Sequence, residues 1–331
     1  MAGYSLFPLG PGKTRTPKMN PWKPVAGSDA LALRAKLLAT IRSFFAARSV
    51  MEVETPLMSA SGNSDPGIAQ FSLVEQLSWL RTSPEYAMKR LLAAGSGDIY
   101  ELGRVFRAGE SGRHHNREFT MLEWYRTGWT YHRLMDEVEE LLRQCFPGQS
   151  LDQTRVSYRD LLIAYAGIDP MTAKDRHIAN CVSAHGIDLQ DLTRTEMLDL
   201  LISFVVQPRL PQDSLIFVFD YPAQQAALAR IRPDEPPVAE RFELFLGPLE
   251  LANGYQELTD AGEQKHRFEV EIQAREKRGD KAAPLDQQLL QALASGMPEC
   301  AGVALGVDRL LMAMLGADSL DAVLAFPAER A

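Results

Sequence analysis

Cysteine is scarce in this sequence. Only Cys145, Cys181 and Cys300 occur among 331 residues, and they are odd in number and far apart. This pattern excludes a disulfide framework and a metal site built on a Cys-x-x-Cys pair. Unpaired cysteines suit a reducing compartment, so we expect a cytoplasmic protein.

Long apolar runs and a surplus of basic charge are also missing. The sequence has neither a run of about 18 apolar residues that could span a bilayer nor the apolar core of a signal peptide, so we expect no membrane contact. Thirty-five basic residues stand against 43 acidic ones, a net charge of -8, which disfavours general binding to nucleic acid. The remaining composition, 46% hydrophobic and 24% charged, is that of a globular protein with a sizeable core.

Apolar periodicity predicts both helices and strands. Residues 1–28 are rich in proline and glycine and are interpreted as an extended arm, and a helix over 29–48 follows, with Ser28 or Asp29 as its cap. Further helices are expected over 85–92, 260–277 and 307–315, and a helical insertion over 131–206. Strands are expected over 50–54, 99–107, 118–126, 215–219, 241–246, 249–257 and 302–306.

The strand over 118–126 has one face suited to a site. Alternation places Phe119, Met121, Glu123 and Tyr125 on that face. A carboxylate beside a phenol can bind an ammonium group, and the phenylalanine can stack on a planar ring. The alternative is a half-buried sheet in which the glutamate pairs with a neighbouring arginine.

Hydrogen-bond donors gather at the turn before this strand. Arg107, Arg113, His114, His115 and Asn116 form a group that suits phosphate oxygens. The adjacent histidines are a poor metal site, because neighbouring side chains rarely point the same way.

A second nucleotide signal lies near the C-terminus. Arg309 is in the first turn of a predicted helix, beside Gly302 and Gly306, where an anion would offset its repulsion by the helix dipole. An ion pair between Arg309 and Asp308 is the alternative.

The segment 240–257 is unusually acidic for a strand region. Two of Glu243, Glu250 and Glu257 could hold Mg²⁺ while another binds an ammonium, with Asn253 nearby. Glu250 and Glu257 would face opposite ways on a flat strand, so we expect a bulge at 253–254. The charged helix that follows carries Glu263/Arg267 and Glu271/Arg275 pairs, which we interpret as a solvated face without chemistry.

These segments together resemble the motifs of class II aminoacyl-tRNA synthetases in their lysine-specific form. The three signature motifs correspond to "RSVMEVETPLM", "GRVFRAGESGRHHNREFTMLEWY" and "GVALGVDRLLMAML". The stretches "LRTSPEYAMKRLL" and "ERFELFLGPLELANGYQELTDAGEQ" add to the resemblance, which covers residues 29–331. It implies an α+β catalytic domain over 29–331, with a mainly antiparallel β-sheet flanked by helices, and a homodimer.

One subgroup fits best. Lysyl-tRNA synthetases carry an anticodon-binding OB-fold before the catalytic domain, and 28 residues are too few for such a barrel. The sequence is therefore most similar to the ligases that activate (R)-β-lysine with ATP and transfer it to a lysine side chain of translation elongation factor P, and tRNA is not an expected partner. Ala304 agrees, because tRNA-charging enzymes usually have glycine there. Two alternatives stay open, a minimal lysyl-tRNA synthetase and a non-catalytic regulator that binds lysine or nucleotide.

The resemblance implies a nucleotide site in which Arg107 contacts the α-phosphate and Phe119 and Arg309 enclose the adenine. Arg107 and Arg309 are thus the expected catalytic residues, and Arg113 and His115 are expected at the γ-phosphate. The other implied ATP-binding residues are Ala108, Gly109, Asn116, Glu250, Leu251 and Gly306.

For the amino acid, the resemblance implies that Glu85 binds the amino group nearer the carboxylate. Tyr125 and Glu257, with Glu123 beside them, would receive the distal ammonium. The other implied pocket residues are Ser83, Pro84, Asn253 and Ala304. Mg²⁺ is expected on Glu243 and Glu250.

The second motif departs from the family pattern. It normally reads Phe-Arg-x-Glu, but Gly109 follows Ala108 here and Glu110 comes one place late. Either Glu110 still reaches the adenine edge, or that contact is lost.

Overall fold

The computed structural model describes residues 22–73, 77–187, 192–281 and 283–331, and nine α-helices lie within them. Their bounds are α1 Ser28–Ala46, α2 Glu85–Ala93, α3 Tyr131–Cys145, α4 Tyr158–Ala166, α5 Asp175–Ala184, α6 Arg194–Leu201, α7 Ala261–Lys277, α8 Gln287–Ala294 and α9 Val307–Met314. A π-helical turn, Ile202–Val206, continues α6.

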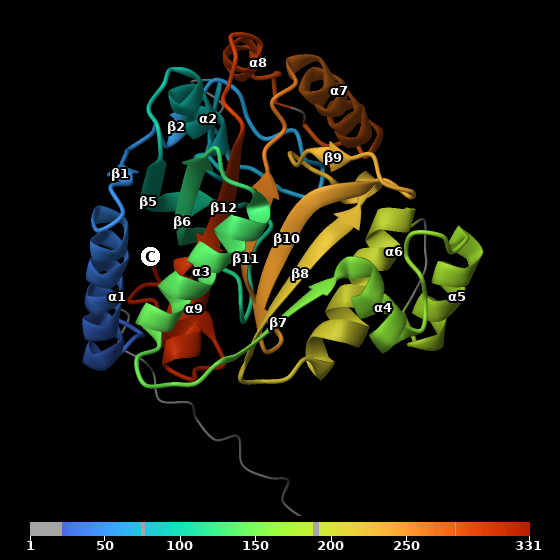
Figure 1. The fold of residues 1–331 in the computed structure, drawn as a ribbon. Helices are drawn as coiled ribbons and strands as arrows, with labels where there is room; N and C mark the ends of the chain where they lie inside the picture. The colour runs from blue at the N-terminus through green and yellow to red at the C-terminus, as the bar shows by residue number, and fades with distance from the viewer. Residues whose placement is uncertain (1–21, 74–76, 188–191, 282) are drawn as a thin grey trace, which may run out of the picture.

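One large sheet forms the centre of the molecule (Figure 1). Its strand order is β1-β5-β6-β12-β11-β10-β8-β7, and β9 pairs with β10. The neighbours are antiparallel except β1/β5 and β7/β8 at the two edges, which confirms a mainly antiparallel sheet. The strands are β1 Met51–Glu52, β5 Ile99–Phe106, β6 Glu118–Thr127, β7 Asp152–Ser157, β8 Ser214–Pro222, β9 Ile231–Arg232, β10 Val238–Leu246, β11 Leu249–Gln256 and β12 Cys300–Gly306.

A second, three-stranded sheet is small. It has the order β2-β4-β3 and contains β2 Met58–Ser59, β3 Ser72–Leu73 and β4 Ser78–Leu80.

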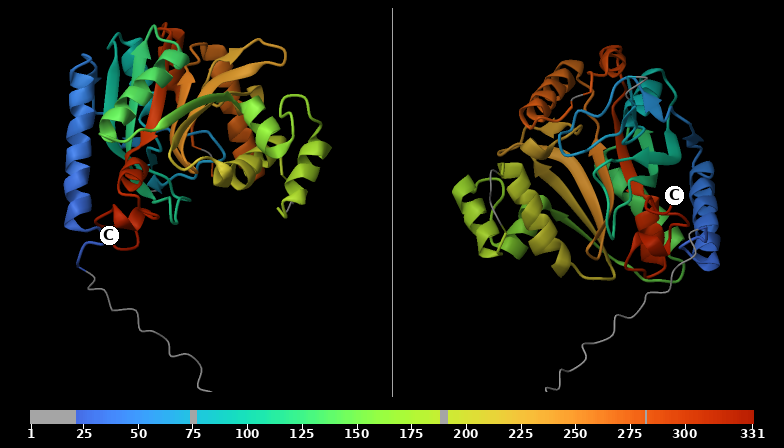
Figure 2. Two further views of the ribbon diagram at one scale, coloured as in Figure 1. Left: turned by 60° about the horizontal axis from the view of Figure 1, so that its bottom comes forward. Right: turned by 180° about the vertical axis from the view of Figure 1, so that it is seen from behind.

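Helices α1, α3 and α9 cover one face of the large sheet, as Figure 2 also shows. Their apolar sides enclose a core that includes Phe45, Trp124, Leu142 and Leu311, each with at most 1% of its surface exposed. On the opposite face, α4 and α6 pack on β8 and β10, while α2 and α8 close the end near β5 and β6. This arrangement leaves the middle strands β6, β12 and β11 free to line a cavity on that second face.

Most predicted elements are confirmed, with small shifts at their ends. The cap of the first helix was wrong: Gly27 occupies the N-cap position, and neither Ser28 nor Asp29 caps the helix through its side chain. The stretch 131–206 is not purely helical, because it also contains β7, which extends the sheet beside β8. Most of the predicted arm, residues 1–21, lies outside the described residues.

No helix in the described part of the chain has both the length and the apolar character needed to cross a membrane.

Candidate active site

A cavity of about 260 Å³ lies on the face of β6, β11 and β12 that the α1–α3–α9 layer leaves uncovered. The predicted alternation on β6 is confirmed: Phe119, Met121, Glu123 and Tyr125 line the cavity, whereas Trp124 points into the opposite core. Residues from distant parts of the sequence therefore meet on one surface of the sheet.

One end of the cavity is acidic and buried. Glu85, at the start of α2, meets Glu123 from β6 and Glu257 from the end of β11. The Glu123 carboxylate accepts hydrogen bonds from the Tyr125 hydroxyl and the Ser83 hydroxyl, both at 2.7 Å. Such a group of buried acceptors suits the ammonium groups of a ligand.

Burial dominates the ionisation of these carboxyl groups. It raises the pKa of Glu123 to about 8, and the negative charge of Glu85 adds to the shift while the Tyr125 and Ser83 hydroxyls oppose it. Burial also raises the pKa of Glu257, which the charge of Lys89 opposes. Burial thus favours the neutral form of Glu123.

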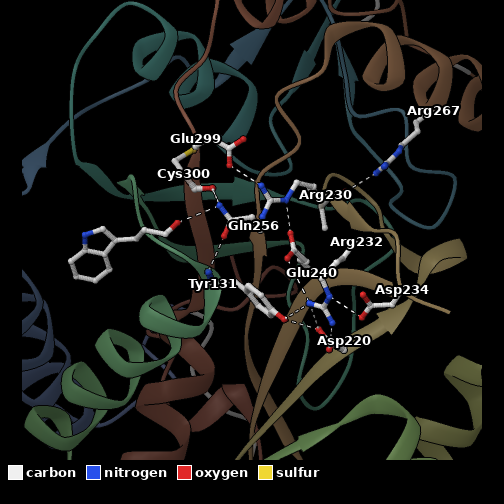
Figure 3. Close-up of polar contacts among 12 residues, drawn as sticks. Tyr131, Asp220, Arg230, Arg232, Asp234, Glu240, Gln256, Arg267, Glu299 and Cys300 are labelled. Carbon is white, nitrogen blue, oxygen red and sulfur yellow. Dashed lines mark hydrogen bonds and ion pairs between the residues drawn. The ribbon is translucent and has the colours of Figure 1, made fainter. Parts of the chain in front are cut away.

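A hydrogen-bond network behind the acidic end fixes the strand that carries Glu257 (Figure 3). The buried Gln256 side chain accepts from the backbone N–H of Tyr131 at 3.0 Å and donates to the carbonyl of Cys300 at 3.0 Å. Next to it, Arg230 bridges Glu240 and Glu299 at 2.5 and 2.8 Å. The network joins the start of α3 to β11, β12 and β10, so Glu257 leaves the sheet at a fixed position.

The other end of the cavity carries two arginines. The Arg107 guanidinium lies 5.2 Å from the centre of the Phe119 ring and donates to Glu110 at 2.9 Å. The displaced acid of the second motif therefore contacts Arg107.

Arg309 is held by three acceptors. It donates to the backbone carbonyls of His114 at 3.2 Å and Glu250 at 3.0 Å, and to Nε2 of His115 at 2.7 Å. Burial and the charge of Arg309 lower the pKa of His115, so the neutral ring accepts this bond. The alternative of an Asp308–Arg309 pair was wrong, because Asp308 pairs with Arg34 and accepts from the N–H of Thr120.

A β-bulge aligns Glu250 with the rest of the site. Phe245 pairs with Glu250 and Leu244 with Ala252, so Leu251 is the extra residue. The bulge was predicted at 253–254, where the ladder is instead regular. Because Leu251 is inserted, Glu250 shares the cavity face with Asn253 and Glu257.

Most of the predicted site residues line this single cavity. They are Ser83, Glu85, Arg107, His115, Asn116, Phe119, Glu123, Tyr125, Glu250, Leu251, Asn253, Glu257, Ala304, Gly306 and Arg309. Pro84, Ala108, Gly109, Arg113 and Glu243 do not.

Two of these exceptions have clear physical reasons. Arg113 turns away to donate to the carbonyl of Asp318 at 2.7 Å, near the C-terminus. Glu243 lies on the correct face of β10 but is paired with Arg241, which separates it from the open cavity.

The cavity also has a wall that sequence reasoning missed. The segment 63–68 and helix α7 contribute Ser64, Asp65, Phe268 and Glu271. Glu271 accepts from the Ser64 hydroxyl, and Arg275 is buried against backbone carbonyls, so the interpretation of these two residues as a solvated pair was wrong. The i,i+4 spacing could not show that a loop more than 200 residues away covers this turn.

A family model described as tRNA synthetases class II (D, K and N) matches residues 24–330. The chain belongs to this family. It is 47% identical to an elongation factor P–(R)-β-lysine ligase of Yersinia enterocolitica, over 94% of this chain and 98% of the relative. Ligases of the same name from Pasteurella multocida and Haemophilus influenzae are 45% and 43% identical, over 94% and 95% of this chain and 98% and 99% of theirs.

Membership of the class II synthetase family accounts for the two ends of the cavity. An enzyme that joins an amino acid to AMP needs a nucleotide site and an amino-acid site that open toward each other. Here β6 alone supplies Phe119 at one end and Glu123 at the other.

The ionisation of Glu123 predicts a pH-dependent stability. The pKa of Glu123 is about 8 in the folded protein, whereas the ordinary value of a glutamate, expected in the unfolded chain, is 4.5. Between these two pH values the folded state retains a proton that the unfolded chain loses. The stability that this proton provides is complete below pH 4.5 and is lost as pH rises through 8. Glu123→Gln should therefore leave the free energy of unfolding nearly unchanged at pH 4.5 and raise it by on the order of a few kcal/mol at pH 8.5.

Urea unfolding at the two pH values measures this difference. Glu118→Gln is the matched control, because Glu118 is on the same strand but half-exposed, and it should give the same small change at both. An equal effect of Glu123→Gln at both pH values would contradict a raised pKa.

Proposed function

We propose that this protein activates (R)-β-lysine with ATP and transfers it to a lysine side chain of translation elongation factor P. The observation that carries the proposal is the single cavity in which Arg107 and Arg309 lie at one end and Glu123 and Glu257 at the other. Curated relatives with 43–47% identity over nearly their whole length carry the name of this ligase.

The reaction has two steps. The β-lysine carboxylate attacks the α-phosphorus of ATP, forming the acyl-adenylate and releasing pyrophosphate. The ε-amine of a lysine of elongation factor P then attacks the acyl carbonyl, forming an amide and releasing AMP. Neither step uses a covalent bond to the protein, so alignment and charge stabilisation carry the catalysis.

The arginines act on the nucleotide. Arg107 would exchange its bond to Glu110 for an α-phosphate oxygen, since both partners are anionic. Arg309, already oriented by two carbonyls and His115, would close over the adenine opposite Phe119. The acidic end would hold the two ammonium groups of the substrate, with the amine nearer the carboxylate on Glu85 and the distal one at Glu123, Tyr125 and Glu257.

Magnesium fits the acidic strand pair between these ends. Glu243 pairs directly with Asn253 across β10 and β11, and Glu250 shares their face. The buried Oδ1 of Asn253 has no hydrogen-bond partner within the described residues, which leaves an oxygen suited to a cation. Within the described ranges no three acidic, histidine or cysteine side chains are placed so that they could hold a metal ion, but Mg²⁺ on a nucleotide needs only one or two carboxylates. Glu250 would hold the ion together with Glu243, which would have to exchange its pairing with Arg241 for the cation, and the ion would supply positive charge to the phosphates.

We also propose a homodimer through the edge that α1, β1 and β2 form. Apolar side chains on this edge are exposed: Leu31 at 39%, Met51 at 49%, Leu57 at 45% and Met58 at 52%. Exposed apolar groups along an edge with an unpaired strand are typical of an interface.

An acceptor assay distinguishes this function from its alternatives. The protein is incubated with ATP and radiolabelled β-lysine, and either elongation factor P or bulk tRNA is offered. We expect label on elongation factor P and not on tRNA, consistent with the acidic net charge of the chain. Label on tRNA alone would identify a tRNA-charging enzyme, and absence of β-lysine-dependent pyrophosphate exchange would indicate a regulator.

Gly302 tests the position of the amino-acid site. A Cβ at this residue would lie 2.3 Å from the Tyr125 ring and 2.6 Å from a Glu257 carboxylate oxygen. Gly302→Ala must displace one of these buried groups, and we expect the KM for β-lysine to rise by about 10- to 100-fold. The KM for ATP should stay within a factor of about two, because the clash lies at the acidic end.

The control is Gly27→Ala, where an added Cβ meets no atom within 4 Å, so both constants should be unchanged. Equal rises in both KM values for Gly302→Ala would argue against separate amino-acid and nucleotide ends.

A further inference from the structure

Lys89 lies directly behind the acidic end of the cavity. It is on α2, one turn after Glu85, and only 1% of its surface is exposed. Its ammonium is 2.7 Å from Oε1 of Glu85 and 2.5 Å from Oε2 of Glu257. Both glutamates line the cavity, but Lys89 does not, so a ligand in the cavity cannot touch it.

The contacts divide each carboxylate between two partners. Glu85 and Glu257 each present one oxygen to Lys89, which leaves the second oxygen for the cavity side. Glu123, the third carboxylate, is bound instead by the Ser83 and Tyr125 hydroxyls. With all four groups ionised, three negative charges and one positive charge leave a net charge of -2, which matches the two ammonium groups of a diamino acid.

Glu257 is buried deeply enough to favour its neutral acid. Burial alone favours the neutral acid, and a nearby cation is what opposes it. Burial also lowers the pKa of a lysine, but Glu257 and Glu85 outweigh that effect and the pKa of Lys89 lies above its ordinary value. Lys89 is therefore a permanent cation, and its ion pairs hold the two glutamates at a fixed separation.

We propose that Lys89 is a positioning residue that pairs with both Glu85 and Glu257 and holds them at a fixed spacing, so that the cavity selects an amino acid with two ammonium groups. This inference rests on the proposed function, because it assigns the two glutamates to the two amines of the substrate. Lys89 contacts no reacting atom; it acts through these carboxylates.

The test compares Lys89→Met and Lys89→Arg in β-lysine-dependent pyrophosphate exchange across pH 6 to 9. Methionine nearly keeps the volume and removes the charge, whereas arginine keeps the charge and adds bulk. For Lys89→Met we expect the KM for β-lysine to rise about 100-fold, the KM for ATP to stay within about twofold, and the optimum for β-lysine to move to higher pH. Lys89→Arg should keep the wild-type pH profile and lie closer to wild type in KM.

Lys265→Met is the matched control, because Lys265 is exposed and its ion pair with Glu269 is loose, at 3.8 Å. This variant should behave as wild type. A folded Lys89→Met enzyme with unchanged KM and pH profile would overturn the proposal, as would a methionine variant that outperforms the arginine variant. If Lys89→Met does not fold, a shifted pH profile for Lys89→Arg overturns it. Wild-type enzyme without β-lysine-dependent exchange would instead refute the proposed function itself, and this inference with it.

Discussion

The site depends on three carboxylates that are buried together. Glu85, Glu123 and Glu257 sit on or beside a sheet whose opposite face is packed with aromatic and aliphatic side chains. Their mutual repulsion and loss of hydration are tolerated because Lys89 pairs with Glu85 and Glu257 from behind the cavity and two hydroxyls donate to Glu123. An acidic pocket of this kind is incomplete until a cationic ligand enters, which couples substrate binding to the charge of the protein.

The sheet sets the distance between the acidic end of the cavity and the end that carries the two arginines. On β6, alternate residues run from Phe119 to Tyr125 along one face, so the two ends are six residues apart on one rigid strand. On β11 the bulge at Leu251 brings Glu250 onto the same face as Glu257. Without that extra residue the carboxylate would point into the α1–α3–α9 core, where an unpaired charge would be costly.

Much of this was predictable from the sequence. Period-two alternation predicted which side chains of β6 face the cavity. The resemblance to the family motifs predicted that Arg107, Glu257 and Arg309 share one site, although they come from distant segments. Predictions made from local sequence spacing were wrong where tertiary contacts determine the position of a side chain. The bulge lies at Leu251, two residues before the predicted 253–254, Arg113 bonds to a carbonyl near the C-terminus, and Glu271 is covered by the loop at Ser64. The sequence analysis did not single out Lys89, because nothing near this residue in the sequence indicates that Glu257 is its partner.

The central claim is that one cavity holds an adenylate and a diammonium group at its two ends. A crystal structure with a non-hydrolysable acyl-sulfamate analogue of β-lysyl-adenylate tests it most directly. We expect the adenine between Phe119 and Arg309, the nearer amine on Glu85, and the distal ammonium within hydrogen-bond distance of Glu123, Tyr125 or Glu257. An analogue bound with its amines away from these carboxylates, or outside the cavity, would contradict the account.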